Sequence, residues 1–276
     1  MNEFHLLYHV KYFTVIQLII YCSLFQPANA QNENWDTYMA KFGDKPGSVL
    51  VDMGLINGAP DKRYPYLVIT GPQAHNCNQQ GLPDKEEIDV QEEILDATNN
   101  FITGVTAKVL TGTFTYNCER LNYYYVKDTM NIRNAIMRLY NRTYKNYSYA
   151  INIKSDPEWS TYRTFLYPSE ATLNWMENNK IIIKMIQHGD SLNTLRNIDF
   201  DLYFKTDSCR KAFAEFARSK RYKTNELPEA KNPNAPFEII VSTYNYIKMD
   251  VINSITEELK KEAKMHHGLY NGWVAK

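Results

Sequence analysis

Residues 108–127 read KVLTGTFTYNCERLNYYYVK, and this stretch decides the fold of the first half of the chain. Aliphatic, β-branched and aromatic side chains dominate Lys108–Tyr116 and Leu121–Lys127, which is typical of strands. The polar residues Asn117–Arg120 separate the two runs. Strands joined by so short a connection pair antiparallel, so the stretch predicts a hairpin with Cys118 at its turn.

The segments on either side of this hairpin predict a larger alternation of strands and helices. A helix is expected to begin at Asp84, because Glu87 three residues later completes a capping box. The other predicted elements are strands at Ser48–Ile56 and Tyr64–Thr70, a helix capped by Asp128 and a strand at Tyr147–Lys154. Apart from the extra first strand, this order is β-α-β-β-α-β, the ferredoxin-like arrangement.

The same topology makes a prediction about the cysteines. The loop after the first core strand carries Cys77, and the hairpin carries Cys118. Both connections lie at one end of a ferredoxin-like sheet, so we expect a Cys77–Cys118 disulfide, with two unpaired thiols as the alternative. A metal site that adds His75 has suitable ligand types but lacks a fourth partner by spacing.

The second half repeats the alternation. In Asn197–Lys205, apolar residues alternate with Asp199, Asp201 and Tyr203, as in a strand with one buried face. The remaining predicted elements are a helix at Ser169–His188, a helix capped by Asp207, strands at Arg221–Leu227 and Phe237–Tyr246, a helix capped by Asp250 and a strand at Leu269–Val274. The predicted fold class is therefore α+β, two tandem ferredoxin-like domains with antiparallel sheets at 31–167 and 168–276.

Residues 1–30 have the pattern of a signal peptide. Lys11 precedes the apolar run Tyr12–Phe25, and Ala28-Asn29-Ala30 is an A-x-A cleavage pattern before Gln31. The expected mature protein begins at Gln31 and is exported, either periplasmic or secreted. No later run is long and apolar enough to predict a membrane span.

Charge and motifs exclude several classes of function. The formal net charge is +0, which does not favour nucleic acid as a partner. The sequence has no P-loop, dinucleotide fingerprint or G-x-S-x-G motif, and no cofactor is expected. His266 and His267 are adjacent and point about 100° apart on a helix, so they are not expected to bind one metal ion. They are expected to end the last helix, with Gly268 as its left-handed cap residue.

Aromatic side chains are the remaining signal. Three consecutive tyrosines cannot all lie on the same face of a strand, so at least one is expected to leave the core face. Exposed tyrosine on an open sheet suits a contact surface. The candidate binding surface comprises Tyr123, Tyr124, Tyr125, Tyr203 and Trp273.

The first half resembles the family catalogued as domain of unknown function 695. The residues that carry this resemblance are Trp35-Asp36-x-Tyr38, Asn122–Val126, Trp159 and Phe165–Pro168. The resemblance is to a family without an assigned activity, so it implies a domain and no chemistry.

The second half is similar to the ribonuclease E regulator B family. Gly189-Asp190-x-Leu192, Asp199–Phe204 and Tyr270–Trp273 carry the similarity. The family usually has histidine and tryptophan where this chain has Phe200 and Asp201, and aspartate at the position of Asn271. The similarity implies a ferredoxin-like fold and a non-enzymatic, protein-binding role, but an exported protein does not meet a cytoplasmic ribonuclease.

The leading functional hypothesis is therefore a non-catalytic exported binding or regulatory protein with an unidentified protein partner. The alternative is a cell-envelope hydrolase or thiol enzyme that uses a cleft between the domains. Its candidate groups are His188, Cys209 and the Asp199/Asp201 pair. That alternative requires His188 and Cys209 to lie in one pocket.

Overall fold

The chain folds into two compact units that meet in sequence between Tyr167 and Pro168. The computed structural model describes residues 33–227 and 233–276, and the predicted signal peptide at 1–30 lies outside these residues.

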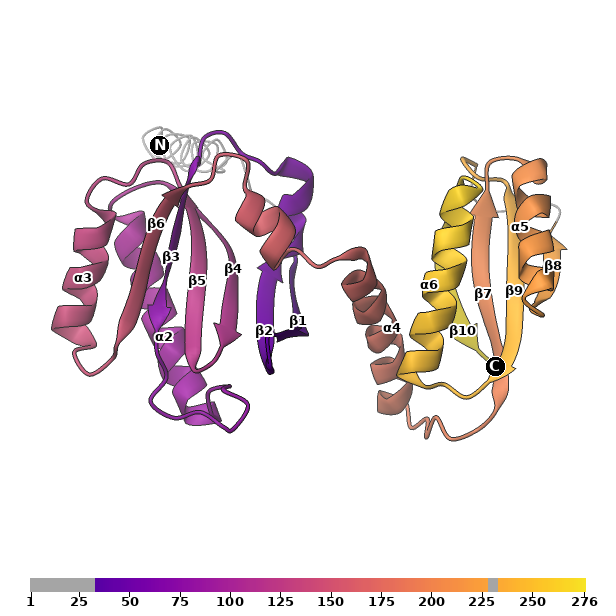
Figure 1. The fold of residues 1–276 in the computed structure, drawn as a ribbon, viewed down its shortest axis with the longest axis horizontal. Helices are drawn as coiled ribbons and strands as arrows, with labels where there is room; N and C mark the ends of the chain where they lie inside the picture. Colours follow the sequence, from indigo (N-terminus) through magenta and orange to yellow (C-terminus); the bar gives the residue numbers. More distant parts are fainter. Residues whose placement is uncertain (1–32, 228–232) are drawn as a thin grey trace, which may run out of the picture. The chain divides into compact units, whose positions relative to one another are not determined.

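The first unit is built on a six-stranded antiparallel sheet (Figure 1). Its strands are β1 (Trp35–Phe42), β2 (Lys45–Asp52), β3 (Tyr66–Pro72), β4 (Lys108–Tyr116), β5 (Glu119–Val126) and β6 (Tyr149–Ser155). Their order across the sheet is β1-β2-β4-β5-β3-β6. The four strands β4-β5-β3-β6 form the predicted ferredoxin-like core, and the β1–β2 hairpin extends the sheet beside β4.

The sequence did not predict strand β1, and it extended the next strand too far. The predicted strand Ser48–Ile56 is divided between β2 and the 3-10 helix η1 (Met53–Gly58). Asp52 causes this change of direction, because its carboxylate accepts a hydrogen bond from the Gly54 amide at 2.9 Å and caps the helix.

Helices α2 (Lys85–Thr103) and α3 (Ile132–Thr143) cover one face of this sheet. The predicted cap of α2 is confirmed: the Asp84 carboxylate accepts from the Glu87 amide at 3.1 Å. The predicted cap of α3 is wrong. Its cap position is Asn131, in a left-handed conformation, whereas Asp128 accepts from the Met130 amide and the Thr106 hydroxyl.

The other face of the sheet is covered by the segment that follows β6, including the single π-helical turn η2 (Tyr162–Leu166). The indole of Trp159 stacks on Tyr125 with ring centroids 4.2 Å apart and donates to the Tyr64 carbonyl at 2.9 Å. The ring of Phe165 lies 6.0 Å from that of Tyr123. Both faces of β5 are therefore buried, and its three tyrosines belong to the core.

Asp156 anchors this covering segment. Its carboxylate accepts from the Tyr125 hydroxyl at 2.7 Å and from the amides of Ser160 and Thr161 at 2.9 Å each. Burial acts to raise the pKa of Asp156, but these hydrogen bonds outweigh it and hold the pKa below its usual value. The ionised carboxylate thus ties the segment to the central strand.

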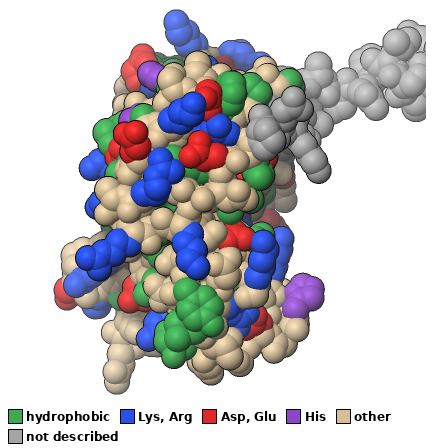
Figure 2. All heavy atoms as spheres, turned by 90° about the vertical axis from the view of Figure 1, so that its right-hand side faces the viewer, with side chains coloured by type: hydrophobic (Ala, Val, Ile, Leu, Met, Phe, Trp, Pro, Cys, Tyr) green, Lys and Arg blue, Asp and Glu red, His purple; other side chains and the backbone are tan. Residues whose placement is uncertain are grey.

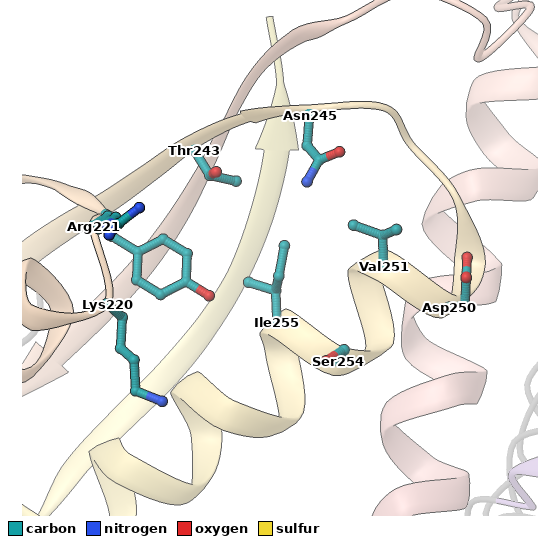
Figure 3. A pocket seen from close by; sticks show the side chains of 9 residues that line it. Lys220, Arg221, Thr243, Asn245, Asp250, Val251, Ser254 and Ile255 are labelled. Atoms are coloured by element: carbon teal, nitrogen blue, oxygen red, sulfur yellow. The ribbon is translucent and has the colours of Figure 1, made fainter.

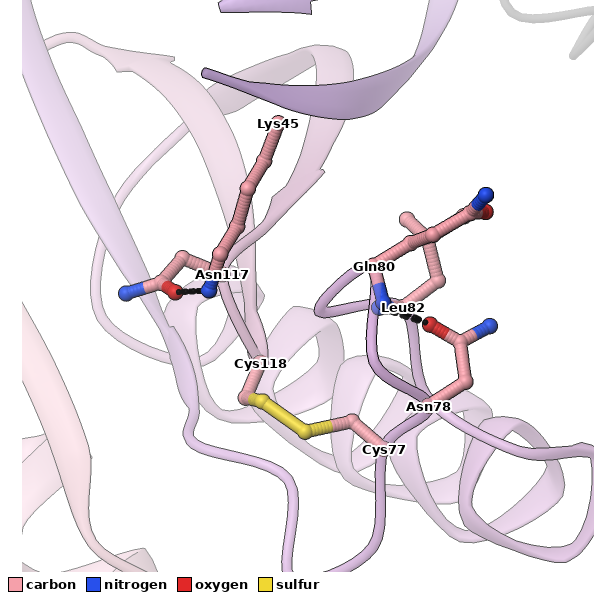
Figure 4. Close-up of a disulfide and its surroundings, with 7 residues drawn as sticks. All are labelled: Lys45, Cys77, Asn78, Gln80, Leu82, Asn117 and Cys118. Atoms are coloured by element: carbon pink, nitrogen blue, oxygen red, sulfur yellow. Dashed lines mark hydrogen bonds between the residues drawn. A yellow bond between two sulfur atoms is a disulfide. The ribbon is translucent and has the colours of Figure 1, made fainter. Parts of the chain in front are cut away.

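The predicted disulfide is confirmed. Cys77 and Cys118 are bonded across 41 residues of sequence, with their Cα atoms 5.9 Å apart. The hairpin turn at Asn117 and Cys118 has positive φ at both residues, which suits a two-residue hairpin connection. As Figure 4 shows, Lys45 donates to the Asn117 side chain at 2.8 Å beside the disulfide.

The described residues of the second unit form four antiparallel strands and three helices. They are α4 (Glu170–Gln187), β7 (Arg196–Phe204), α5 (Asp207–Ser219), β8 (Lys223–Leu227), β9 (Phe237–Asn245), α6 (Met249–Met265) and β10 (Gly268–Ala275). The strand order β10-β7-β9-β8, with α5 and α6 as the crossovers, is the predicted ferredoxin-like topology. The fold class is therefore confirmed for both units.

Three predicted helix ends in the second unit are wrong. The cap of α5 is Thr206, whose hydroxyl accepts from the Cys209 amide, and Asp207 is the first helical residue. Helix α6 begins after Lys248, without a side-chain cap, and Asp250 lies in its first turn.

Gly268 is not the left-handed residue that ends α6. His267 takes that conformation, with φ +53°, and Gly268 is the first residue of β10. A Cβ atom at Gly268 would lie 2.4 Å from the ring of Phe204. The glycine is therefore needed for the close approach of β10 to β7.

Breaking the disulfide should destabilise the first unit. A Cys77→Ser/Cys118→Ser variant lacks the cross-link between two residues that are 41 positions apart in the sequence. Loop-closure entropy then predicts a loss of about 4 kcal/mol in the free energy of unfolding. Urea unfolding measures the loss, with Cys209→Ser as the control that should change stability by less than about 1 kcal/mol. Equal stability of the double variant and the wild-type protein would contradict the prediction.

Removing the hydroxyl that links Asp156 to β5 should also lower the free energy of unfolding of the first unit. Tyr125→Phe leaves a buried carboxylate and the Tyr162 amide without that partner, for an expected loss of about 1.5–3 kcal/mol. Tyr66→Phe, at a ring that is 36% exposed, is the control and should have little effect on urea unfolding.

The same carboxylate should contribute to acid unfolding of the first unit. Because the folded pKa of Asp156 lies below its unfolded value of about 3.9, its contribution is present above that value and is lost as the pH falls through the folded pKa. Asp156→Asn should therefore be less stable than wild type at neutral pH, and the gap should narrow below about pH 4. A gap that stays constant from pH 7 to pH 2 would refute this reading.

Candidate functional site

Strand β7 divides the second sheet into a buried face and a partly open face. Its buried residues pack with α5 and α6, and they are Ile198, Phe200, Leu202 and Phe204, each with no exposed surface. The alternate residues Asp199, Asp201 and Tyr203 point to the opposite face. Their register partners on β9 are Ser242, Ile240 and Glu238. We call this second surface the open face of the second unit.

Asp199 is the most buried acidic group on the open face, with 8% of its surface exposed. One carboxylate oxygen accepts from the Ser242 hydroxyl at 2.6 Å and from the Asn197 amide group at 2.5 Å. The other oxygen lies 2.6 Å from the Lys276 ammonium. Burial acts to raise the pKa of Asp199, but these three partners lower it below its usual value, so the group is ionised at neutral pH.

Asp201 lies two residues further along the same strand and has a different environment. Its Oδ2 atom accepts from the Tyr203 hydroxyl at 2.8 Å and from the Asn271 amide group at 2.9 Å. Its Oδ1 atom is buried without a hydrogen-bond partner in the described part of the chain. Burial, together with the bond to Asp201, raises the pKa of Tyr203 to about 12, so its hydroxyl remains a donor.

A bulge in β10 opens the edge of the sheet next to these two carboxylates. The pairing with β7 shifts between Tyr270 and Gly272, which leaves Asn271 as the extra residue. Gly272 has φ +142°, and a Cβ atom built there would contact nothing within 4 Å. The bulge thus turns Asn271 toward Asp201 and leaves open space beside Gly272.

A hollow of about 400 Å³ lies at this place. Three acidic residues contribute to its lining, together with apolar groups from α4, β9 and β10 and with Lys276. The lining comprises Ile181, Asp199, Asp201, Glu238, Ile240, Asn271, Gly272, Trp273, Val274 and Lys276. We call it the acidic hollow.

Trp273 is a structural anchor of the acidic hollow. Its ring belongs to the core, with 5% of the residue exposed, and its indole donates to the Asn178 side chain on α4 at 2.9 Å. The Asn178 amide group in turn donates to Thr256 of α6 at 2.8 Å. This network holds α4 against the end of β10.

The predicted binding surface is largely wrong. Tyr123, Tyr124 and Tyr125 are 5%, 0% and 0% exposed, because helices cover one face of β5 and the segment after β6 covers the other. Trp273 is buried as well, although its strand borders the hollow. Of the five predicted residues, only Tyr203 is partly exposed on the open face.

A second hollow, of about 540 Å³, lies between the start of β8, the end of β9 and the first turns of α6 (Figure 3). It is lined mainly by polar groups, including Thr243, Asn245 and Ser254. Its Lys220 is paired with Glu258 at 2.5 Å, and Glu258 also accepts from the Tyr222 hydroxyl. The acidic hollow combines three acidic residues with a cation that already contacts Asp199, so it is the stronger candidate site.

Of the residues proposed for the alternative enzyme, Asp199 and Asp201 share the acidic hollow, but His188 and Cys209 are not brought together in the described hollows. His188 borders a hollow formed by the last turn of α4, and Cys209 is not among the residues that line it. Cys209 packs beside the core of the second unit from α5. His266 bonds Glu262 at 3.1 Å, and no group of acidic, histidine or cysteine residues suited to a metal ion occurs in the described ranges.

Sequence reasoning missed three residues of the site. Asn271 was recognised only as a departure from a family pattern, and Lys276 and Asn178 were not considered. The alternation in β7 does place Asp199 and Asp201 on one face, but pairing across strands, and not local spacing, brings Lys276 and Asn271 to them.

Comparison with known proteins agrees with the division into units. Residues 33–167 match the family of unknown function DUF695, and residues 175–274 match the family Regulator of ribonuclease activity B. No curated protein matches the chain. A crystal structure described as that of a candidate glycine cleavage system transcriptional repressor is similar over 76% of this chain and 98% of its own, at 10% identity and a TM-score of 0.20, and carries no argument about function. The chain therefore joins a first unit that resembles DUF695 to a second unit that resembles Regulator of ribonuclease activity B.

Proposed function

We propose that this chain is an exported, non-catalytic regulatory protein that binds a protein partner through the open face of its second unit. The match of that unit to a family of regulators supports a regulatory or binding role. The acidic hollow supplies the place where a partner would dock. The target is not the cytoplasmic ribonuclease if residues 1–30 direct export, so the partner is a protein of the cell envelope or exterior.

The observation that carries this proposal is the uneven burial of the second sheet. One face packs against two helices, while the other presents apolar side chains to solvent beside the carboxylates. Val274 is 57% exposed, Leu269 53% and Tyr244 67%. Exposed apolar groups that are bordered by polar and charged residues are typical of surfaces that bind other proteins.

The distribution of charge supports a protein partner over nucleic acid. On the face shown in Figure 2, acidic and basic side chains are interspersed, without a broad field of one sign. The groups that line the acidic hollow would repel phosphates. Within the described residues, no helix has the length and apolar character that crossing a membrane requires.

Introducing a charge at an exposed apolar residue of the open face should weaken partner binding. A partner recovered by cross-linking from the cell envelope should bind Val274→Asp at least about tenfold more weakly than wild type, because the new carboxylate would be buried at the interface. Met265→Asp is the matched control, since Met265 is 58% exposed at the end of α6 and its variant should bind like wild type. Equal binding by all three proteins would remove the open face from the proposal.

Processing of the first thirty residues tests the proposed location. In a bacterial host, the exported protein should begin at Gln31, as determined by N-terminal sequencing of the envelope or extracellular fraction. Ala30→Arg should block cleavage, because the A-x-A pattern requires a small side chain there, and an uncleaved precursor should accumulate. A cytoplasmic protein that retains residues 1–30 would contradict export.

A further inference from the structure

We propose that the acidic hollow is a receptor for a basic side chain, lysine or arginine, of the partner protein, and that Lys276 of this chain occupies the same place until the partner displaces it. This inference rests on the proposed function and adds the chemistry of the partner and a competing intramolecular contact.

The first argument is that the hollow already binds a cation. The Lys276 ammonium lies 2.6 Å from the Asp199 carboxylate, within the lining of the hollow. The side chain of Asp199 is 11% exposed and that of Lys276 is 68% exposed. The carboxylate is therefore a built part of the sheet, whereas the ammonium can leave without disturbing any packing.

The second argument is that Asp201 retains unused capacity. Tyr203 and Asn271 both donate to Oδ2, and Oδ1 is buried without a hydrogen-bond partner in the described residues. A buried carboxylate oxygen without a donor is costly. Lysine and arginine each carry several donors, and both carboxylates line the same hollow, so one entering group can replace Lys276 at Asp199 and also interact with Asp201.

The third argument concerns shape. Apolar groups lie beside the carboxylates, from Ile240 on β9 and Val274 on β10. An extended lysine or arginine side chain has an apolar stem and a charged end, so it can pack its methylene groups on such a wall while its charge reaches the acids. A phosphate or a carboxylate would be repelled by the acidic residues of the lining.

Lys276 and a cation from outside compete for the Asp199 carboxylate, and the effect of this competition on affinity can be measured. The Lys276 ammonium is mostly exposed to solvent, so removing it should strengthen binding of an outside cation by only about two- to fivefold. Lys276→Met removes the charge and keeps an unbranched side chain. Asp201→Asn removes the second carboxylate and should weaken binding by about tenfold or more.

The test is an NMR titration of the folded protein with N-acetyl-arginine amide, with N-acetyl-citrulline amide as the neutral probe of nearly the same shape. The arginine probe should shift the backbone amides of β7 and β10 and the indole signal of Trp273, and its affinity should fall as salt rises. Citrulline should produce no such shifts. Glu215→Gln, a neutralised exposed acid on α5, should bind arginine like wild type.

Three results would overturn the proposal: equal shifts from the arginine and citrulline probes, unchanged arginine affinity in Asp201→Asn, or weaker arginine binding in Lys276→Met. Asp199→Asn provides a second variant should Asp201→Asn not fold, and it should lose binding in the same direction. If the partner binds wild type and Asp201→Asn equally, the protein-binding function stands and this site is refuted. If the probes behave as expected but no partner binds the open face, the cation site stands and the proposed function is refuted.

Discussion

In the first unit, the sheet face opposite helices α2 and α3 is buried by the segment that follows β6. The contrast between the two units depends on this burial. Both units use the same four-stranded topology with two helices on one face. In the first unit, Asp156 fastens the segment after β6 across the other face, and Trp159 stacks on the central strand. The second sheet has side chains on its other face that remain partly exposed. One unit is therefore closed on both sides, and the other presents a surface.

Buried carboxylates have opposite consequences in the two units. In the first, Asp156 receives three hydrogen bonds from its own unit, so its charge is fully used to hold the covering segment. In the second, one partner of Asp199 is the exposed ammonium of Lys276, and one oxygen of Asp201 has no hydrogen-bond partner among the described residues. A charge satisfied by rigid neighbours stabilises a fold, whereas a charge that is satisfied only in part favours binding of a further group.

The sequence predicted the elements well and their ends less well. Asp84 caps α2 as expected because its helix begins where local hydrogen bonding favours it, but Asp128 and Asp250 do not cap α3 and α6. In those two cases the helix begins after Asn131 and after Lys248 instead, so an aspartate near an apolar stripe is a weak signal of the cap position. The disulfide was predictable for the opposite reason: the topology itself brings Cys77 and Cys118 to one end of the sheet, whatever the local details.

The sequence by itself determined the two ferredoxin-like units, the pairing of the cysteines and the common face of Asp199 and Asp201, because each follows from a period along the strand or from the order of elements. Only the tertiary structure decided that the three tyrosines of β5 are core residues, since helices α2 and α3 cover Tyr124 and residues more than thirty positions away cover Tyr123 and Tyr125. Likewise, the β10 bulge and the approach of Lys276 and Asn271 depend on strand pairing across the sheet. The alternation of side chains along a strand specifies the face on which each side chain lies. Only packing specifies whether that face contacts solvent, another segment or a partner.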